Sequence, residues 1–172
     1  WLDVRAGEHR PTAYLAAAYF LLLLFYYLLK PARDSLFLVE LDASHLPLAF
    51  TLTALVAAPV TAAYARAGLR RRLDRLVVFT TAALLVHLVI LRWLVQIDQG
   101  WVFYVFYAWV GVAGGLVTSQ FWLMANGIFD AVQAKRLFPV LSLGGIAGAF
   151  CGGEITGLLV DRLSVATSDL LT

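Results

Sequence analysis

A short charged run, Lys30-Pro31-Ala32-Arg33-Asp34, lies between two apolar stretches near the start of the chain. On a helix, Lys30 lies three residues before Arg33 and four before Asp34, so the three side chains share one face. A guanidinium and an ammonium one turn apart are suited to holding an anion such as a phosphate, because both donate charge-assisted hydrogen bonds. Asp34 would orient the two cations. Lys30, Arg33 and Asp34 are therefore candidate substrate-binding residues for an anionic small molecule.

Two interpretations of this run differ in where the first membrane span ends. If the span ends at Leu29, the charged side chains extend to lipid headgroups and act only as anchors. If it continues through the apolar residues 35–41, the charges lie in or beside a spanning segment, where idle charges are rare. In that case Pro31 leaves the carbonyl of Tyr27 without its helical donor, so this oxygen needs another partner.

Four further polar residues lie within apolar stretches. His87 and Glu154 are candidate proton- or ion-coupling groups, because an ionisable side chain in a span is costly and is usually functional or paired. The alternatives are a hydrogen-bonded packing role for His87 and extension of Glu154 to the interface. Gln120 and Asn126 either join the substrate site by lining a cavity or bridge neighbouring helices.

The elements that must position these side chains are membrane-spanning helices. Hydrophobic residues make up 62% of the 172 residues and charged residues 14%, whereas soluble domains are about 45–50% apolar and about 25% charged. About 20 apolar residues span the bilayer core, and the qualifying stretches are 12–38, 46–67, 76–95, 101–125 and 137–160. We predict an all-α transmembrane protein in which residues 1–172 form a single, partial helical bundle within the lipid bilayer. Because the chain opens at Trp1 rather than Met, we expect it to be part of a longer protein.

The last of these stretches carries two ladders of small residues. Gly144, Gly148 and Gly152 are spaced by four, and Gly153 belongs to a second ladder with the same spacing. Small residues at this spacing let two helix backbones approach closely. We interpret these glycines as helix-packing positions.

Basic residues are distributed unevenly between the loops. Nine of the 13 Lys and Arg residues lie before the first stretch, at the end of the second or between it and the third, or between the fourth and fifth. The opposite loops, 40–45 and 97–100, contain neither Lys nor Arg. Because basic loops remain in the cytoplasm, we predict a multi-pass protein with a cytoplasmic amino terminus.

Enzyme motifs are missing from the sequence. There is no His-Glu-x-x-His pair, no Gly-x-Ser-x-Gly elbow and no phosphate-binding glycine loop after a strand. We therefore expect no enzymatic activity, no cofactor and no metal. The arginine run 70–72 beside a span is typical of a topology signal or a lipid contact, so we expect no nucleic-acid partner.

Two stretches resemble the nucleotide (ATP/ADP) translocase family. Residues 26–36 (YYLLKPARDSL) are similar to its first-helix pattern of a basic residue, two intervening residues, a second basic residue, Asp and an apolar run. Residues 121–126 (FWLMAN), followed by 133–138 (QAKRLF) and the glycines, resemble a second family pattern. The resemblance extends over about residues 12–160, the first five helices of the amino-terminal half.

The resemblance implies an exchanger of nucleotides with about twelve helices, related to the major facilitator fold. It further implies that basic residues of the first helix contact phosphates, and Arg33 and then Lys30 are the matching positions. This chain departs from the family where it has Gly127 after the Ala-Asn pair and Ala108 midway along the fourth helix, since the family has acidic residues there. These departures point to a different substrate or to loss of transport.

We therefore expect the amino-terminal bundle of a major-facilitator-like transporter in a bacterial inner membrane. It would exchange nucleotides or another phosphate-bearing anion by alternating access, together with a second helical bundle. The alternative is a non-transporting membrane scaffold or accessory subunit derived from a transporter half.

Overall fold

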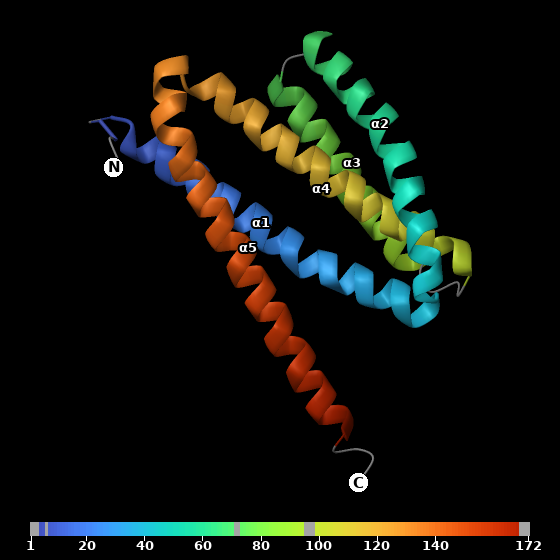
Figure 1. The fold of residues 1–172 in the computed structure, drawn as a ribbon. Helices are drawn as coiled ribbons and strands as arrows, with labels where there is room; N and C mark the ends of the chain where they lie inside the picture. Colours follow the sequence, from blue (N-terminus) through green and yellow to red (C-terminus); the bar gives the residue numbers. More distant parts are fainter. Residues whose placement is uncertain (1–3, 6, 71–72, 95–98, 169–172) are drawn as a thin grey trace. The chain divides into compact units, whose positions relative to one another are not determined.

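The computed structural model describes residues 4–5, 7–70, 73–94 and 99–168, and these are almost entirely helical (Figure 1). Five α-helices and one short 3-10 helix follow one another in the order α1 (His9–Glu40), η1 (Ala43–His45), α2 (Leu46–Arg70), α3 (Leu73–Leu94), α4 (Gly100–Ile128) and α5 (Ala131–Ser168). Each α-helix contains a segment long and apolar enough to cross a membrane. The predicted all-α transmembrane fold class is thus confirmed.

The helix boundaries agree with the predicted spans at most ends. α1 continues without interruption past Pro31 to Glu40, so the helix itself does not end at Leu29. α2 begins at Leu46, directly after η1, whose N-cap Asp42 accepts a hydrogen bond from the Ala43 N–H at 2.7 Å. α3 begins three residues before the predicted start, and the predicted end, Val95, lies outside the described residues. α4 extends three residues beyond its predicted end.

The predicted start of the fifth helix at Leu137 is wrong, because α5 begins at Ala131. Asp130 accepts hydrogen bonds from the backbone N–H groups of Val132 and Gln133 at 2.9 and 2.8 Å, and the Gln133 amide oxygen accepts one from the Asp130 N–H at 3.1 Å. This reciprocal pattern is a capping box, which satisfies donors that a helix start leaves unpaired. The basic residues that suggested a loop therefore lie in the first turns of a helix.

The chain divides into two compact units. The first unit comprises Trp1–Pro31 and Ala125–Thr172, and the second comprises Ala32–Met124.

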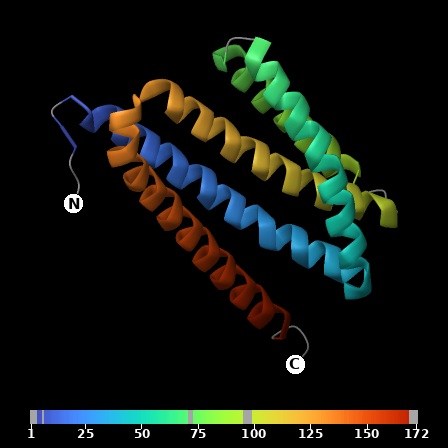
Figure 2. The ribbon, with the colours of Figure 1, turned by 45° about the horizontal axis from the view of Figure 1, so that its top comes forward.

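In the first unit, α5 lies beside the first part of α1 (Figure 2). A Cβ placed on Gly144 would come within 2.6 Å of the Ala16 carbonyl oxygen, and one on Gly152 within 2.6 Å of the Leu24 carbonyl oxygen. A Cβ on Gly148 would overlap the carbonyl oxygen of Phe20. Residue numbers rise together on both helices, so the two run parallel, with backbones too close for any side chain between them. A Cβ on Gly153, by contrast, meets nothing within 4 Å in the described part of the chain.

The carbonyl that Pro31 deprives of its helical donor lies in this contact. The hydroxyl of Thr156 on α5 lies 3.5 Å from the Tyr27 carbonyl oxygen, at the outer limit of a hydrogen bond, and donates to the Gly152 carbonyl at 2.9 Å. α5 thus offers a polar group where the proline interrupts the hydrogen bonding of α1.

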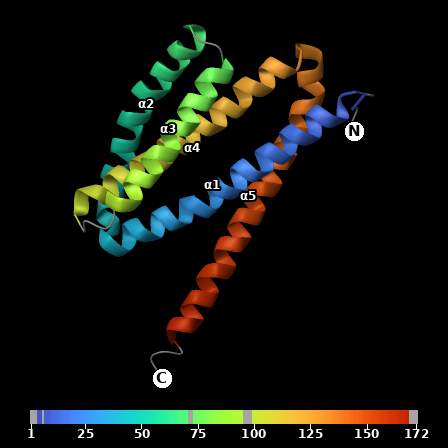
Figure 3. The same ribbon diagram turned by 180° about the vertical axis from the view of Figure 1, so that it is seen from behind.

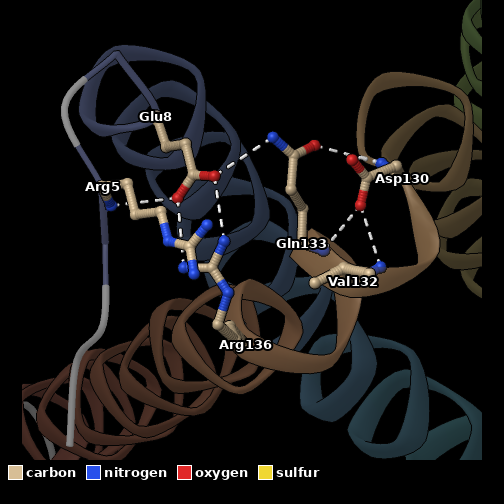
Figure 4. Close-up of polar contacts among 6 residues, drawn as sticks. All are labelled: Arg5, Glu8, Asp130, Val132, Gln133 and Arg136. Carbon is tan, nitrogen blue, oxygen red and sulfur yellow. Dashed lines mark hydrogen bonds and ion pairs between the residues drawn. The ribbon is translucent and has the colours of Figure 1, made fainter.

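A polar cluster joins the starts of α1 and α5 within the first unit (Figure 4). The Arg136 Nη2 lies 3.0 Å from the Glu8 Oε1, and the Gln133 amide donates to the same oxygen at 3.1 Å. The Glu8 side chain is 12% exposed and that of Arg136 19%. A backbone hydrogen bond from the Arg5 N–H, with smaller contributions from the Arg136 and Gln133 side chains, lowers the pKa of Glu8 below its ordinary value of 4.5.

Glu8→Gln is expected to lower the Tm of the full-length protein at neutral pH. Because the folded-state pKa of Glu8 is lowered, its carboxylate stabilises the fold fully above its ordinary pKa, and this stabilisation disappears as the pH falls through the lowered value. The Tm difference between wild type and the variant should therefore shrink below about pH 4.5. Thermal unfolding in detergent at several pH values measures it, with the exposed Glu40→Gln as the control. A difference that does not change with pH would contradict this role of Glu8.

The second unit contains the end of α1, η1, α2, α3 and most of α4 (Figure 3). Its core is formed by Phe37 of α1, Ala49 of α2, and Phe103 and Tyr107 of α4. α2 and α4 approach closely where a Cβ on Gly111 would lie 2.8 Å from the Thr53 side chain. These contacts bring the last turns of α1, which carry Arg33, against α4.

Candidate functional site

Arg33 is the most completely enclosed charged side chain in the described part of the chain, and its residue is 5% exposed. Its Nε and Nη2 both donate to the Asp34 Oδ1, at 2.9 and 2.6 Å. The guanidinium carbon lies 3.9 Å from the centre of the Tyr107 ring. A buried guanidinium is thus neutralised in its plane by a carboxylate and covered on one face by an aromatic ring, which stabilises a cation through its π electrons.

The sequence around each partner explains this arrangement. Arg33 and Asp34 are successive residues of α1, so an ion pair between them needs only a bent side chain. Tyr107 reaches them from α4, where Phe37 of α1 packs against the same ring with centroids 4.9 Å apart. Gly111 lies one turn after Tyr107, and a Cβ there would lie 2.8 Å from the Thr53 side chain and 3.7 Å from the Arg33 Nη1. The glycine therefore lets α4 pack closely against Thr53 beside the guanidinium.

The two ends of the guanidinium differ in their partners. Nε and Nη2 are occupied by Asp34, whereas Nη1 has no hydrogen-bond acceptor among the side chains that the structure describes. An arginine donates five hydrogen bonds when fully paired. The unpaired end is a position where an anionic oxygen would find a charged donor in a largely dry environment.

The other predicted substrate residues lie elsewhere. Lys30 belongs to the first unit, where its ammonium lies 5.8 Å from the centre of the Tyr27 ring. Asn126, also in the first unit, is exposed near the end of α4. The substrate roles of these two residues stay predictions.

Gln120 is buried, at 3% exposed, and bridges helices within the second unit. Its amide nitrogen donates to the Thr80 hydroxyl of α3 at 2.6 Å. It is 13 residues beyond Tyr107 on α4, which corresponds to about 20 Å along the helix axis. Of the two roles considered from the sequence, the contacts are those of a helix bridge, and its contact with a substrate stays a prediction.

The two candidate coupling residues have different surroundings. The His87 Nδ1 lies 2.7 Å from the Ala83 carbonyl oxygen, and because a carbonyl only accepts, this nitrogen carries the proton. His87 also lines an apolar cavity of about 470 Å³ between α2, α3 and α4, together with Ala108 and Trp109. Glu154 is exposed on α5 in the first unit. Their roles in coupling stay predictions, and the cavity has no charged lining to hold a nucleotide.

Tyr107 and Gly111 are residues of the site that sequence reasoning missed. Their spacing of four places them on one face of α4, where the Tyr107 ring can cover a flat cation and Gly111 permits a close approach. That pattern alone is weak, because it does not say which helix supplies the cation.

Comparison with known proteins completes the description of this site. The family profile described as "TLC ATP/ADP transporter" matches residues 76–170, which is 95 of the 172 residues. The chain belongs to the TLC ATP/ADP transporter family. The resemblance drawn from the sequence motifs is thereby confirmed. The matched region includes most of α3 and all of α4 and α5, and it begins after Arg33.

Individual proteins are similar to this chain over shorter segments. The chain is 31% identical over 83 residues to ADP,ATP carrier protein 3 of Rickettsia prowazekii (strain Madrid E), which is 48% of this chain and 17% of that protein. It is 32% identical over 65 residues to ADP,ATP carrier protein 3 of Rickettsia bellii (strain RML369-C), covering 37% and 13%. The matched segments thus span less than a fifth of these relatives. No solved structure matches the chain.

Proposed function

We propose that this chain is the amino-terminal part of a membrane transporter that exchanges nucleotides or another phosphate-bearing anion by alternating access. The observation that carries the proposal is Arg33, a buried guanidinium inside a spanning helix with one end open. Such a charge is costly to maintain in a membrane protein and is usually functional. Membership of the TLC ATP/ADP transporter family and similarity to proteins named ADP,ATP carriers support nucleotides as the substrate class.

In this proposal Arg33 contacts a phosphate oxygen of the substrate, Lys30 supplies a second positive charge from the same helix, and Asp34 orients the guanidinium. The substrate cavity would be completed by a second, major-facilitator-like helical bundle. The membrane would be a bacterial inner membrane. Ala108 and Gly127 occupy positions where the family resemblance implies acidic residues, so the panel of substrates to be tested extends beyond ATP and ADP.

Exchange by the full-length natural protein in liposomes tests this function. Liposomes preloaded with unlabelled ADP should take up labelled ATP or ADP, and empty liposomes should not. The same measurement with other nucleoside phosphates and with organic phosphates identifies the preferred substrate. Uptake equal to that of protein-free liposomes for every compound would instead support a non-transporting membrane subunit.

The asymmetry of basic residues supports a cytoplasmic amino terminus. Reporter fusions after Arg70, at the end of α2, and after Asp130, before α5, are expected to lie in the cytoplasm. A fusion after Gln99, before α4, is expected to lie outside, because α3 crosses the membrane between Arg70 and Gln99. Paired alkaline phosphatase and fluorescent protein fusions measure the location. Cytoplasmic location of the Gln99 fusion would contradict the proposed orientation.

A further inference from the structure

The hydrogen bonds of Arg33 are divided between an occupied edge and an open edge. Nε and Nη2 donate side by side to the Asp34 Oδ1, at 2.9 and 2.6 Å. Parallel donors of this kind are those that a carboxylate or phosphate takes when it binds arginine in a fork. A carboxylate of the chain itself therefore occupies the donors best suited to a substrate phosphate.

The two partners of this ion pair differ in their freedom to move. The Arg33 side chain is 7% exposed, whereas that of Asp34 is 38% exposed. Tyr107 also covers a face of the guanidinium, with 3.9 Å between the Arg33 Cζ and the ring centre. Moving Arg33 would break this stacking, whereas Asp34 can rotate outward and find other donors or water. The carboxylate is thus the partner that can leave.

The other edge of the guanidinium, at Nη1, is unpaired, since it has no acceptor among the side chains that the structure describes. Because the Tyr107 ring blocks one face, an anion approaches in the plane of the guanidinium. It can contact Nη1 before Asp34 has moved, so the guanidinium is not left unpaired at any stage.

We propose that Asp34 is an internal counter-ion, and that a phosphate-bearing ligand binds Arg33 by entering at Nη1 and displacing Asp34 from Nε and Nη2. This inference rests on the proposed function, because it takes Arg33 as the substrate contact. It adds that Asp34 competes with the substrate and sets its affinity. The return of Asp34 to Arg33 then favours release of the ligand, which an exchanger needs in every cycle.

Asp34→Asn in the full-length protein tests whether the ligand displaces Asp34. The amide keeps the shape of the side chain and removes the competing charge. ATP, ADP and inorganic tripolyphosphate are expected to bind about tenfold more tightly, the size of effect that one neighbouring charge has on a titrating group. Release of bound ligand should slow to a similar extent. Titration calorimetry and stopped-flow displacement measure the two quantities.

Two controls separate the effect of the Arg33–Asp34 ion pair from long-range electrostatic effects of removing a negative charge. Glu40→Gln removes the same charge from the exposed end of the same helix and should leave the Kd unchanged. Arg33→Ala combined with Asp34→Asn should lose the tightening. Equal tightening by Glu40→Gln would overturn the proposal, because the effect would then be long-range electrostatics.

The outcomes separate this inference from the proposed function. If wild type binds ATP through Arg33 but Asp34→Asn binds it equally or more weakly, the substrate contact stands and the displacement of Asp34 is overturned. If no nucleotide binds, yet Asp34→Asn tightens tripolyphosphate binding in an Arg33-dependent manner, the displacement of Asp34 is supported and the nucleotide function fails. If neither nucleotide nor tripolyphosphate binds any variant, the displacement of Asp34 is overturned as well.

A second variant covers the case in which Asp34→Asn does not accumulate. Asp34→Ser leaves more space beside Arg33 and can be purified in inorganic phosphate as a replacement counter-ion. If phosphate takes the place of Asp34, it should raise the Tm of this variant more than that of wild type. Equal stabilisation of both proteins by phosphate would overturn it.

Discussion

Gly148→Ala is expected to destabilise the full-length protein by about 3 kcal/mol, the upper part of the range for overpacked sites. The added Cβ would overlap the Phe20 carbonyl oxygen and lie 2.8 Å from the carbonyl carbon. These are backbone atoms of α1, which cannot move aside as a flexible side chain can. The two parallel helices would have to separate along their length, which forfeits their other close contacts.

Gly153→Ala, five residues further along α5, is the matched control. A Cβ there meets nothing within 4 Å in the described part of the chain. The same substitution should therefore stabilise the helix by up to about 1 kcal/mol, because alanine has the higher helix propensity. Thermal unfolding of both variants in detergent compares them. Equal behaviour of the two would show that the α1–α5 contact does not hold the first unit together.

Arg33→Ala is expected to weaken nucleotide binding by about 100-fold or more, as truncation of a buried, hydrogen-bonded charge does. Asp34 is left without its partner, but its side chain is 38% exposed, so the protein should stay folded. Arg33→Lys should recover only part of the affinity, because lysine keeps the charge and loses the planar fork that stacks on Tyr107. Titration of ATP and ADP into the purified full-length variants measures the effect.

Arg92→Ala provides the control for a general loss of positive charge. Arg92 is exposed in the last turn of α3. Its removal is expected to leave the nucleotide Kd unchanged. If Arg33→Ala binds as wild type does, or if both substitutions weaken binding equally, then Arg33 is not the substrate contact.

The sequence by itself determined the fold class, and four of the five helices lie within three residues of the predicted stretches at their described ends. Length and apolarity are properties of each segment alone, and a membrane admits such segments only as helices. The start of α5 was also present in the sequence, as Asp130 followed three residues later by Gln133. We predicted a loop there because Lys135 and Arg136 follow, and a charged run between two spans is typical of a loop. The ion pair of Arg136 with Glu8, 128 residues away, shows what that charge does instead.

The tertiary structure alone decided which side chains meet. One residue along a helix corresponds to a rotation of about 100°, so the neighbour of a side chain depends on how two helices are turned and aligned. Both glycine ladders of α5 have the same spacing, yet Gly148 lies against the backbone of α1 and Gly153 does not. The polarity of Gln120 is compatible with substrate binding, but in the structure its side chain donates a hydrogen bond to Thr80. Arg33 has Tyr107 over its guanidinium for the same reason: α4 presents that face to α1, and no local pattern in either helix specifies the rotation.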